Sequence, residues 1–220
     1  MSQPKALYAV YGASGCGRGV MPVAREQLLQ QGISKDNLVF LDDNPGLDQI
    51  NGHRLLNYTD FLSQPVNQRF VVLAIANSKV REKLEKRLLQ DGVNNWSVQA
   101  SNLVKMDDVE IGEGAILCPF TTLTSNIRIG KHFHANLYSY VEHDCVIGDF
   151  VTFAPGVKCN GNIVIEDHVY IGAGATIKQG APGRPLVIGR GAVVGMGAVV
   201  TKSVPPGVVV VGNPAKPLEK

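Results

Sequence analysis

A six-residue repeat of apolar side chains runs through the middle of this chain. Counting in sixes from residue 111 meets twelve apolar residues without an exception: Ile111, Leu117, Leu123, Ile129, Ala135, Val141, Ile147, Phe153, Cys159, Ile165, Ile171 and Ile177. Since 45% of the chain is hydrophobic, one fixed phase would do this by chance only about once in ten thousand trials. The repeat is therefore a structural signal.

A period of six fits neither a helix face nor a simple alternating strand. It is typical of a parallel β-helix, in which each short strand sends one aliphatic side chain to the axis and turns form the corners. Three hexads make one triangular coil, so residues 18 apart stack at about one strand spacing. We expect about five coils between Asp107 and Pro205. The phase breaks between Ile177 and Ile188, where five extra residues must leave the coil.

The first hundred residues follow a different pattern, that of a small βαβ nucleotide-binding module. Strands are predicted at 6–11, 38–41 and 70–76, a helix after the glycine-rich segment 12–19, a loop from 44 to 69, and a helix at 78–90. Val80, Leu84 and Leu88 should face inward on that last helix. We therefore predict an α/β, Rossmann-like domain at 1–100 and a β-helix domain at 101–220.

Two features of the first domain are candidates for nucleotide binding. Their residues are Gly12, Ser14, Gly15 and Cys16 in the glycine-rich turn, and Asp42 and Asp43 at the end of the second strand. The turn does not have the GxGxxG spacing of NAD-binding proteins. Its glycines still let backbone N–H groups approach a diphosphate, and the acids can accept a ribose or base hydrogen bond. A tight strand-to-helix turn with capping acids explains the same residues, and both readings stay open on the loop alone.

One histidine of the β-helix is a candidate general base. His143 and Asp144 follow the axial Val141 by two and three positions, so they should lie at a corner and face outward. A neutral imidazole there can accept a proton from an attacking amine or hydroxyl. Gly161 lies 18 residues on, and its bare N–H is a candidate oxyanion donor. A solvated corner histidine is the simpler alternative, but the flanking acids and the stacked glycine favour catalysis.

Composition excludes several other classes of function. The formal charge is +2 with Lys and Arg scattered, which gives no argument for nucleic acid or a membrane surface. The four cysteines form no CxxC pair, and His132 and His168 share a column without a third ligand, so no metal site is predicted. Reduced cysteines, no signal-peptide-like start and no apolar run of about 20 residues predict a cytoplasmic protein without membrane insertion.

The C-terminal tail resembles that of hexapeptide-repeat acyltransferases. A short strand at 208–211 is followed by Gly212-Asn213-Pro214-Ala215-Lys216. The resemblance implies left-handed coiling of the β-helix, a homotrimer, and acyl-CoA bound between neighbouring β-helices. It also implies that the tail residues line the coenzyme A groove.

Three segments narrow the resemblance to one group of enzymes. Tyr-Gly-Ala-Ser-Gly at 11–15, Phe-Leu-Asp-Asp at 40–43 and Val-Glu-His-Asp-Cys-Val-Ile-Gly at 141–148 resemble the sugar-nucleotide N-acetyltransferases of the bacillosamine pathway, close kin of sialic acid O-acetyltransferases. The resemblance covers nearly the whole chain. It implies acetyl transfer from acetyl-CoA to the 4-amino group of a UDP-4-amino-4,6-dideoxy-N-acetylhexosamine, without a metal.

The resemblance also assigns roles to individual residues. The family's catalytic histidine corresponds to His143, its helper acid, commonly Glu, to Asp144, its asparagine to Asn136, and the glycine that holds the thioester carbonyl to Gly161. The acetyl-CoA-binding residues implied are Thr152, Gly161, Gly212, Asn213, Pro214 and Lys216. Two positions depart from the family, because Cys16 and Thr152 stand where it has histidines. Two other functions remain open: an O-acetyltransferase for sialic acid or another sugar, and a non-catalytic β-helix scaffold.

Overall fold

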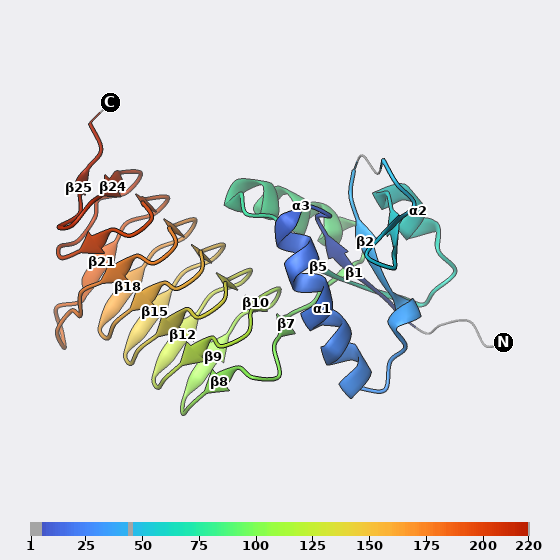
Figure 1. Ribbon diagram of the computed structural model, residues 1–220, viewed down its shortest axis with the longest axis horizontal. Coiled ribbons are helices and arrows are strands. Elements are labelled where there is room, and N and C mark those ends of the chain that lie inside the picture. Colours follow the sequence, from blue (N-terminus) through green and yellow to red (C-terminus); the bar gives the residue numbers. More distant parts are fainter. Residues whose placement is uncertain (1–5, 44–45, 220) are drawn as a thin grey trace. The chain divides into compact units, whose positions relative to one another are not determined.

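The computed structural model describes residues 6–43 and 46–219. Residues 1–5, to which the prediction about a signal peptide applies, lie outside the described residues. The chain divides into two compact units between Ser101 and Asn102. Figure 1 shows a helix-covered sheet in the first unit and stacked short strands in the second.

The first unit is a six-stranded sheet in the order β3-β4-β2-β1-β5-β6, parallel except for β3. Its strands are β1 (Ala6–Tyr11), β2 (Leu38–Leu41), β3 (Gln49–Ile50), β4 (His53–Leu56), β5 (Gln68–Leu73) and β6 (Asn94–Asn95). The short strand β7 (Val98–Gln99) follows β6 in the chain and is not part of this sheet. Its helices are α1 (Gly15–Gln30), the 3-10 turn η1 (Lys35–Asn37), α2 (Tyr58–Ser63) and α3 (Ser78–Gln90). Strand order reverses at β1, which has β2 on one side and β5 on the other. Open α/β sheets bind ligands beyond the carboxyl ends of the strands at such a switch point.

Three predictions for this unit were wrong in detail. The segment from 46 to 69 is not a loop, because it forms β3, β4 and α2. The strand predicted to reach Ala76 ends at Leu73. On α3, Val80 is 40% exposed, and the buried stripe consists of Arg81, Leu84, Glu85 and Leu88. Because Arg81 and Glu85 are polar, the pattern of apolar residues alone did not predict which face of α3 is buried.

The second unit is a parallel β-helix with three sheets. Sheet I contains β8 (Val104–Lys105), β11 (Thr122–Leu123), β14 (Tyr140–Val141), β17 (Lys158–Cys159), β20 (Thr176–Ile177) and β23 (Val199–Val200). Sheet II contains β9 (Val109–Ile111), β12 (Ile127–Ile129), β15 (Cys145–Ile147), β18 (Ile163–Ile165) and β21 (Leu186–Ile188). Sheet III contains β10 (Ile116–Leu117), β13 (His134–Ala135), β16 (Thr152–Phe153), β19 (Tyr170–Ile171), β22 (Val193–Val194), β24 (Val209–Val211) and β25 (Lys216–Pro217). We call the turns that lead from sheet I to sheet II corner I–II, and those from sheet III to sheet I corner III–I.

The six-residue repeat correctly predicts the buried positions and the strand register of this unit. Of the twelve hexad positions, all are buried except Ile111 in the first coil, which is partly buried. Residues 18 apart pair in register, as Ile129 does with Ile147. Burying each such aliphatic side chain stabilises the fold by about 1.5–3 kcal/mol. A charged residue at an axial position would therefore disrupt its coil.

The phase break is confined to one corner. Ile165 pairs with Ile188, so the register of sheet II resumes immediately after the insertion. The extra residues lie in corner I–II, where Ala181 and Arg184 form a small bridge. At the other end of the last coil, β24 pairs antiparallel with β25, so the tail forms a hairpin against sheet III.

Candidate active site

Corner I–II presents a histidine–carboxylate pair. Val141 points to the axis at 1% exposure, and the turn that follows carries His143 and Asp144 outward, with side chains 45% and 49% exposed. Asp144 adopts φ +57°, a left-handed conformation that Asp tolerates. This turn brings His143 Nδ1 to 2.8 Å from Asp144 Oδ2. The two side chains therefore form one unit.

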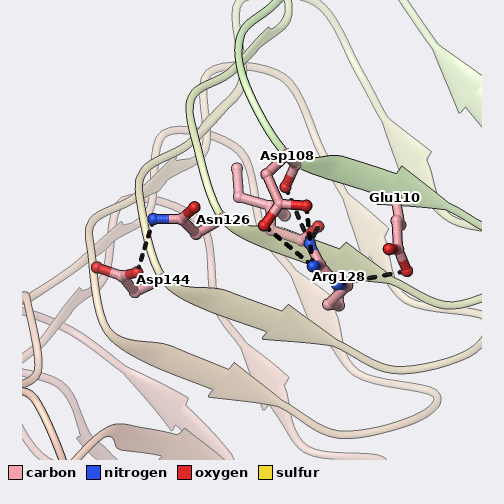
Figure 2. A network of polar contacts seen from close by, with 6 residues as sticks. Asp108, Glu110, Asn126, Arg128 and Asp144 are labelled. Carbon is pink, nitrogen blue, oxygen red and sulfur yellow. Dashed lines mark hydrogen bonds and ion pairs between the residues drawn. The ribbon is translucent and has the colours of Figure 1, made fainter.

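Asp144 is held from a second side by the preceding coil. Asn126 Nδ2 donates to Asp144 Oδ1 at 3.2 Å, and Figure 2 shows this contact beside the ion pairs of Arg128 with Asp108 and Glu110. The hydrogen bond with His143, and then that with Asn126, holds the pKa of Asp144 below its ordinary value. An ionised carboxylate carries no proton, so Nδ1 of the neutral imidazole must donate to it. That leaves the lone pair of His143 on Nε2, free to accept a proton.

Gly161 lies against the imidazole from the following coil. Asp144 N donates to Ser125 O and Asn162 N donates to His143 O, which confirms the stacking of three coils at this corner. A Cβ added to Gly161 would lie 2.6 Å from both Cε1 and Nε2 of His143. Any side chain at Gly161 would therefore displace the His143 ring from this position.

The next two coils of corner I–II line an open cavity of about 380 Å³. The insertion forms one wall and the last turn of the corner, Thr201 to Ser203, forms the other. Lys178, Arg184 and Lys202 bring three cationic side chains to its lining. The break in the hexad phase predicts the insertion, but it predicts no function for these three cationic residues. Counting along the coils from His143 would have predicted that these residues lie on the same corner of the β-helix.

The other residues carried over from the family lie elsewhere on the β-helix. Asn136 begins a turn of corner III–I, where its Oδ1 accepts from Leu137 N at 2.8 Å. The turn at Gly212, Asn213 and Pro214 lies at the end of β24, and Val199 N donates to Gly212 O at 2.9 Å. Lys216 is in β25, and Thr152 is buried in β16. Within one chain, the structure does not bring these residues to the corner that carries His143.

The glycine turn of the first unit is held by close backbone contacts. Gly12 has φ +109°, and a Cβ on Gly17 would lie 1.6 Å from the Gly12 carbonyl oxygen. The tight strand-to-helix turn therefore requires glycine at positions 12 and 17, whether or not a nucleotide binds there. Helix α1 begins directly after it, and its N-cap, Ser14, makes no side-chain capping hydrogen bond. The N-terminus of α1 thus has no acid of its own to offset its dipole, which suits an anion.

The two acids after β2 are tied to different elements. Asp42 Oδ2 accepts from Ala13 N at 3.3 Å, and Asp43 Oδ1 accepts from the Tyr11 hydroxyl at 2.5 Å. Burial, and then the bond to Asp43, raises the pKa of Tyr11, so the phenol stays protonated and donates. Arg87 Nη1 lies 3.9 Å from Asp43 Oδ1 and its guanidinium lies 3.9 Å over the Tyr58 ring. Tyr11, Tyr58 and Arg87 were missed by the sequence analysis, since no repeat links them to Asp43.

Arg81 of α3 is buried, and its guanidinium bonds to the chain just after the end of β5. Arg81 Nη1 donates to the carbonyls of Ile75 and Ala76 at 2.8 and 3.0 Å. Burial lowers the pKa of Arg81 to about 10, so it remains a cation at neutral pH. Burial raises the pKa of Cys16, although the charge of Arg81 opposes this shift. Cys16 is therefore a neutral thiol in the glycine turn.

The remaining histidines occupy packed positions. The rings of His132, Phe150 and His168 stack with centroids 5.1 and 5.3 Å apart, as the column spacing predicts. His134 in β13 and His53 in β4 are both 5% exposed. Within residues 6–43 and 46–219, no three His, Cys, Asp or Glu side chains gather as a metal site, and no helix is long and apolar enough to cross a membrane.

Comparison with known proteins identifies the family. The model of the PglD N-terminal domain matches residues 8–88. The GDP-perosamine N-acetyltransferase of Escherichia coli O157:H7 is 50% identical over 214 residues, 97% of each chain. WeeI from Acinetobacter baumannii AYE superposes with a TM-score of 0.94 at 62% identity, covering 97% of this chain and 100% of that one. The acetyltransferase domain of PglB from Neisseria gonorrhoeae FA1090, in complex with acetyl coenzyme A, has a TM-score of 0.82 at 26% identity, covering 97% and 99%.

These matches span both units and confirm the predicted resemblance. The architecture they share is a Rossmann-like module followed by a left-handed parallel β-helix. The chain therefore belongs to the family of PglD-like sugar N-acetyltransferases and is an acetyltransferase enzyme.

Proposed function

We propose that this enzyme transfers the acetyl group of acetyl-CoA to the 4-amino group of a UDP-linked 4-amino-4,6-dideoxy-N-acetylhexosamine, with His143 as general base. The observation that carries the proposal is the His143–Asp144 pair seated on Gly161, since it leaves Nε2 as a proton acceptor beside a bare backbone position. The relative named as a GDP-perosamine N-acetyltransferase supports an amine on a nucleotide-linked sugar as acceptor.

The proposed reaction needs only side chains and the backbone of corner I–II. The amine attacks the thioester carbonyl, and His143 Nε2 takes the proton that the nitrogen loses as the C–N bond forms. The Gly161 N–H stabilises the oxyanion of the tetrahedral intermediate. Asp144 stabilises the imidazolium that results. When the C–S bond breaks, the imidazolium returns its proton to the CoA sulfur.

The same corner offers a place for the phosphates of the donor. Lys178, Arg184 and Lys202 line the cavity two coils beyond His143. A CoA molecule with its thioester at His143 would extend along corner I–II and place phosphate groups near these cations. The tail residues Gly212, Asn213, Pro214 and Lys216, with Thr152, would complete the groove from a second β-helix.

The split of the expected site residues between two corners supports a homotrimer. His143 and Gly161 lie on corner I–II, whereas Asn136 and the Gly212–Pro214 turn lie on corner III–I. Corner III–I also exposes large apolar side chains, namely Phe120, Leu137, Tyr138 and Met196, at 40–82% exposure. A neighbouring copy would cover these side chains and bring the two sets of residues together, so that three sites form per trimer.

The first unit is the proposed acceptor platform. The diphosphate would face the N-terminus of α1 and the Gly12–Cys16 turn, with Ser14 and Gly15 nearest, and the nucleoside would bond to Asp42 and Asp43. A GDP-linked 4-amino sugar is a second candidate acceptor, favoured by the 50% identical relative.

The test is thiol release from acetyl-CoA with a panel of acceptors. The panel contains UDP- and GDP-linked 4-amino-4,6-dideoxyhexoses, the matching 4-hydroxy sugars, and free sialic acid. We expect release with a 4-amino sugar nucleotide and an amide in the product. Release with a hydroxyl acceptor alone would support an O-acetyltransferase, and no release with any of these acceptors would refute both proposed acceptors.

A further inference from the structure

Two buried thiols lie directly behind corner I–II. Cys145 and Cys159 are 1% and 0% exposed. Cys145 Sγ lies 3.3 Å from the carbonyl oxygen of Asn160 and 3.6 Å from that of His143, and Cys159 Sγ lies 3.9 Å from the same Asn160 oxygen. The Asn160 carbonyl therefore points inward, toward two sulfur donors.

That carbonyl shares a peptide group with the N–H of Gly161. Among the described residues the Asn160–Gly161 bond is trans, and in a planar trans peptide the C=O and N–H point in opposite directions. An inward carbonyl thus means that the Gly161 N–H points away from the core. Within residues 6–43 and 46–219, no hydrogen-bond acceptor takes that N–H. The donor is directed outward and is available.

The side chain of Asn160 fixes the same peptide from two neighbouring coils. Its Nδ2 donates to Ile177 O at 2.7 Å, and its Oδ1 accepts from the Tyr140 hydroxyl at 3.0 Å. These two bonds hold the Cα of Asn160 between the coils, and rotation of the Asn160–Gly161 peptide would break the contacts between its carbonyl oxygen and the thiols. The peptide is consequently held from below, from above and from the core.

We propose that Cys145, Cys159 and Asn160 are positioning residues that aim the Gly161 N–H at the oxyanion. The inference rests on the proposed role of Gly161, and none of the three side chains needs to touch substrate. The hydrogen bond with Cys145, and then burial, raises the pKa of Cys159, so this thiol stays protonated. A thiol is a weak donor, but a fixed dipole aimed where charge develops contributes more in the transition state than in the ground state.

The test compares Cys145→Ala with Cys145→Ser in the full chain. We expect Cys145→Ala to lower kcat about three- to tenfold with KM for acetyl-CoA unchanged, because the oxyanion exists only in the transition state. Cys145→Ser keeps a hydroxyl donor and should restore most of the kcat. Ile127→Val is the matched control, since Ile127 pairs with Cys145 in sheet II and has no polar group. It should retain wild-type kcat.

Two results would overturn the inference: wild-type kcat in Cys145→Ala, or Cys145→Ser as slow as Cys145→Ala. If Cys145→Ala does not fold, Tyr140→Phe removes only the hydroxyl that bonds to Asn160 and should lower kcat about two- to threefold. An unchanged kcat there would also overturn it. Loss of activity in His143→Ala alongside full activity in Cys145→Ala would refute the positioning role alone. Full activity in His143→Ala would instead refute the proposed function.

Discussion

The β-helix and the Rossmann-like unit place functional side chains by different rules. In the β-helix, Asn126 and Asp144 are 18 residues apart and hydrogen-bonded, because one coil is three hexads long. In the first unit, Tyr11 and Asp43 are 32 residues apart and hydrogen-bonded, and no period relates them. A repeat converts sequence separation directly into spatial separation. Without one, contacts depend on how loops close at the edge of the sheet.

The two units also differ in how far their site residues support the fold. His143 and Asp144 are exposed on a turn whose shape is set by the axial residues beneath it. Tyr11, in contrast, is buried in β1 and joins Asp43 to the core. Substitutions in corner I–II should therefore alter activity without loss of stability, whereas those beside Asp43 should alter both nucleotide binding and stability.

Among the substitutions that test this difference between the two units, His143→Ala should have the largest effect on activity. Loss of the base should lower kcat at least about a hundredfold. The melting temperature should stay near that of the wild type, because the imidazole is exposed and the coil does not depend on it. Steady-state kinetics and thermal melting test this together, with acetyl-CoA affinity as the control. A near-normal kcat would contradict the assigned base.

Gly161→Ala should have the next largest effect. Its Cβ would force the His143 ring aside, so we expect kcat to fall about ten- to a hundredfold. Gly161→Pro also removes the N–H and should be slower still. Gly19→Ala is the control, because its Cβ meets open space on α1 and helix propensity predicts a small gain in stability. Equal activity in Gly161→Ala and wild type would remove Gly161 from the site.

In the first unit, Asp43→Ala should weaken nucleotide binding about tenfold and leave acetyl-CoA affinity unchanged. Hydrogen bonds to the nucleoside hold the acceptor and do not act on the thioester. The Tyr11 hydroxyl would also lose its acceptor, which should cost about 1–3 kcal/mol of unfolding free energy. Calorimetry with UDP and with GDP, combined with thermal melting, tests both parts. Asp42→Ala should affect binding with less loss of stability. If neither UDP nor GDP binds the wild type, the first unit is not the acceptor platform.

The cavity lined by Lys178, Arg184 and Lys202 predicts a smaller effect on the donor. Neutralising Lys178 or Lys202 as glutamine should raise KM for acetyl-CoA a few-fold without changing kcat, since exposed charges contribute little each. The effect should shrink as salt is added. Lys158→Gln, on the exposed face of sheet I, is the control. A KM that is insensitive to both substitutions and to salt would place the phosphates elsewhere.

The smallest effect concerns the pH range in which Asp144 holds His143. A depressed pKa means that the contribution of the carboxylate is present above its ordinary pKa and is lost as the pH falls through the lower, folded value. Asn126→Ala removes one of the two bonds that depress it and should move that loss to a higher pH. Near pH 7 the change in kcat should be less than about twofold. A titration of the carboxyl by NMR checks the direction, and an unmoved pKa would show that Asn126 is irrelevant to it.

The fold was predictable wherever burial alone determines position. The hexad phase located the axis, the five-coil extent and the insertion, and the 18-residue spacing placed Gly161 beside His143. Prediction failed where a polar residue is buried for a local reason. Arg81 replaces an apolar residue on α3 because it bonds two carbonyls after β5, which no count of apolar residues reveals. His134 is similarly buried at an outward strand position.

The candidate site was predictable in part for the same reason. Spacing found His143, Asp144 and Gly161, and would have found Asn126. It could not find Arg87 or Tyr58, whose positions depend on where α3 and α2 lie over the sheet. Asn136 and the C-terminal turn were carried over by resemblance, and a single chain places them on another corner. Their role depends on assembly, which no pattern within one chain describes.

The confinement of the insertion to one corner has a consequence for how such proteins diversify. Because the pairing of Ile165 with Ile188 is intact, the chain can lengthen or shorten the loop between them without repacking any coil. Loop length in this position is thus decoupled from foldability. Protein engineers could graft longer or differently charged loops here to change which acyl carrier is accepted, and could do so while reusing the same scaffold and the same general base two coils away.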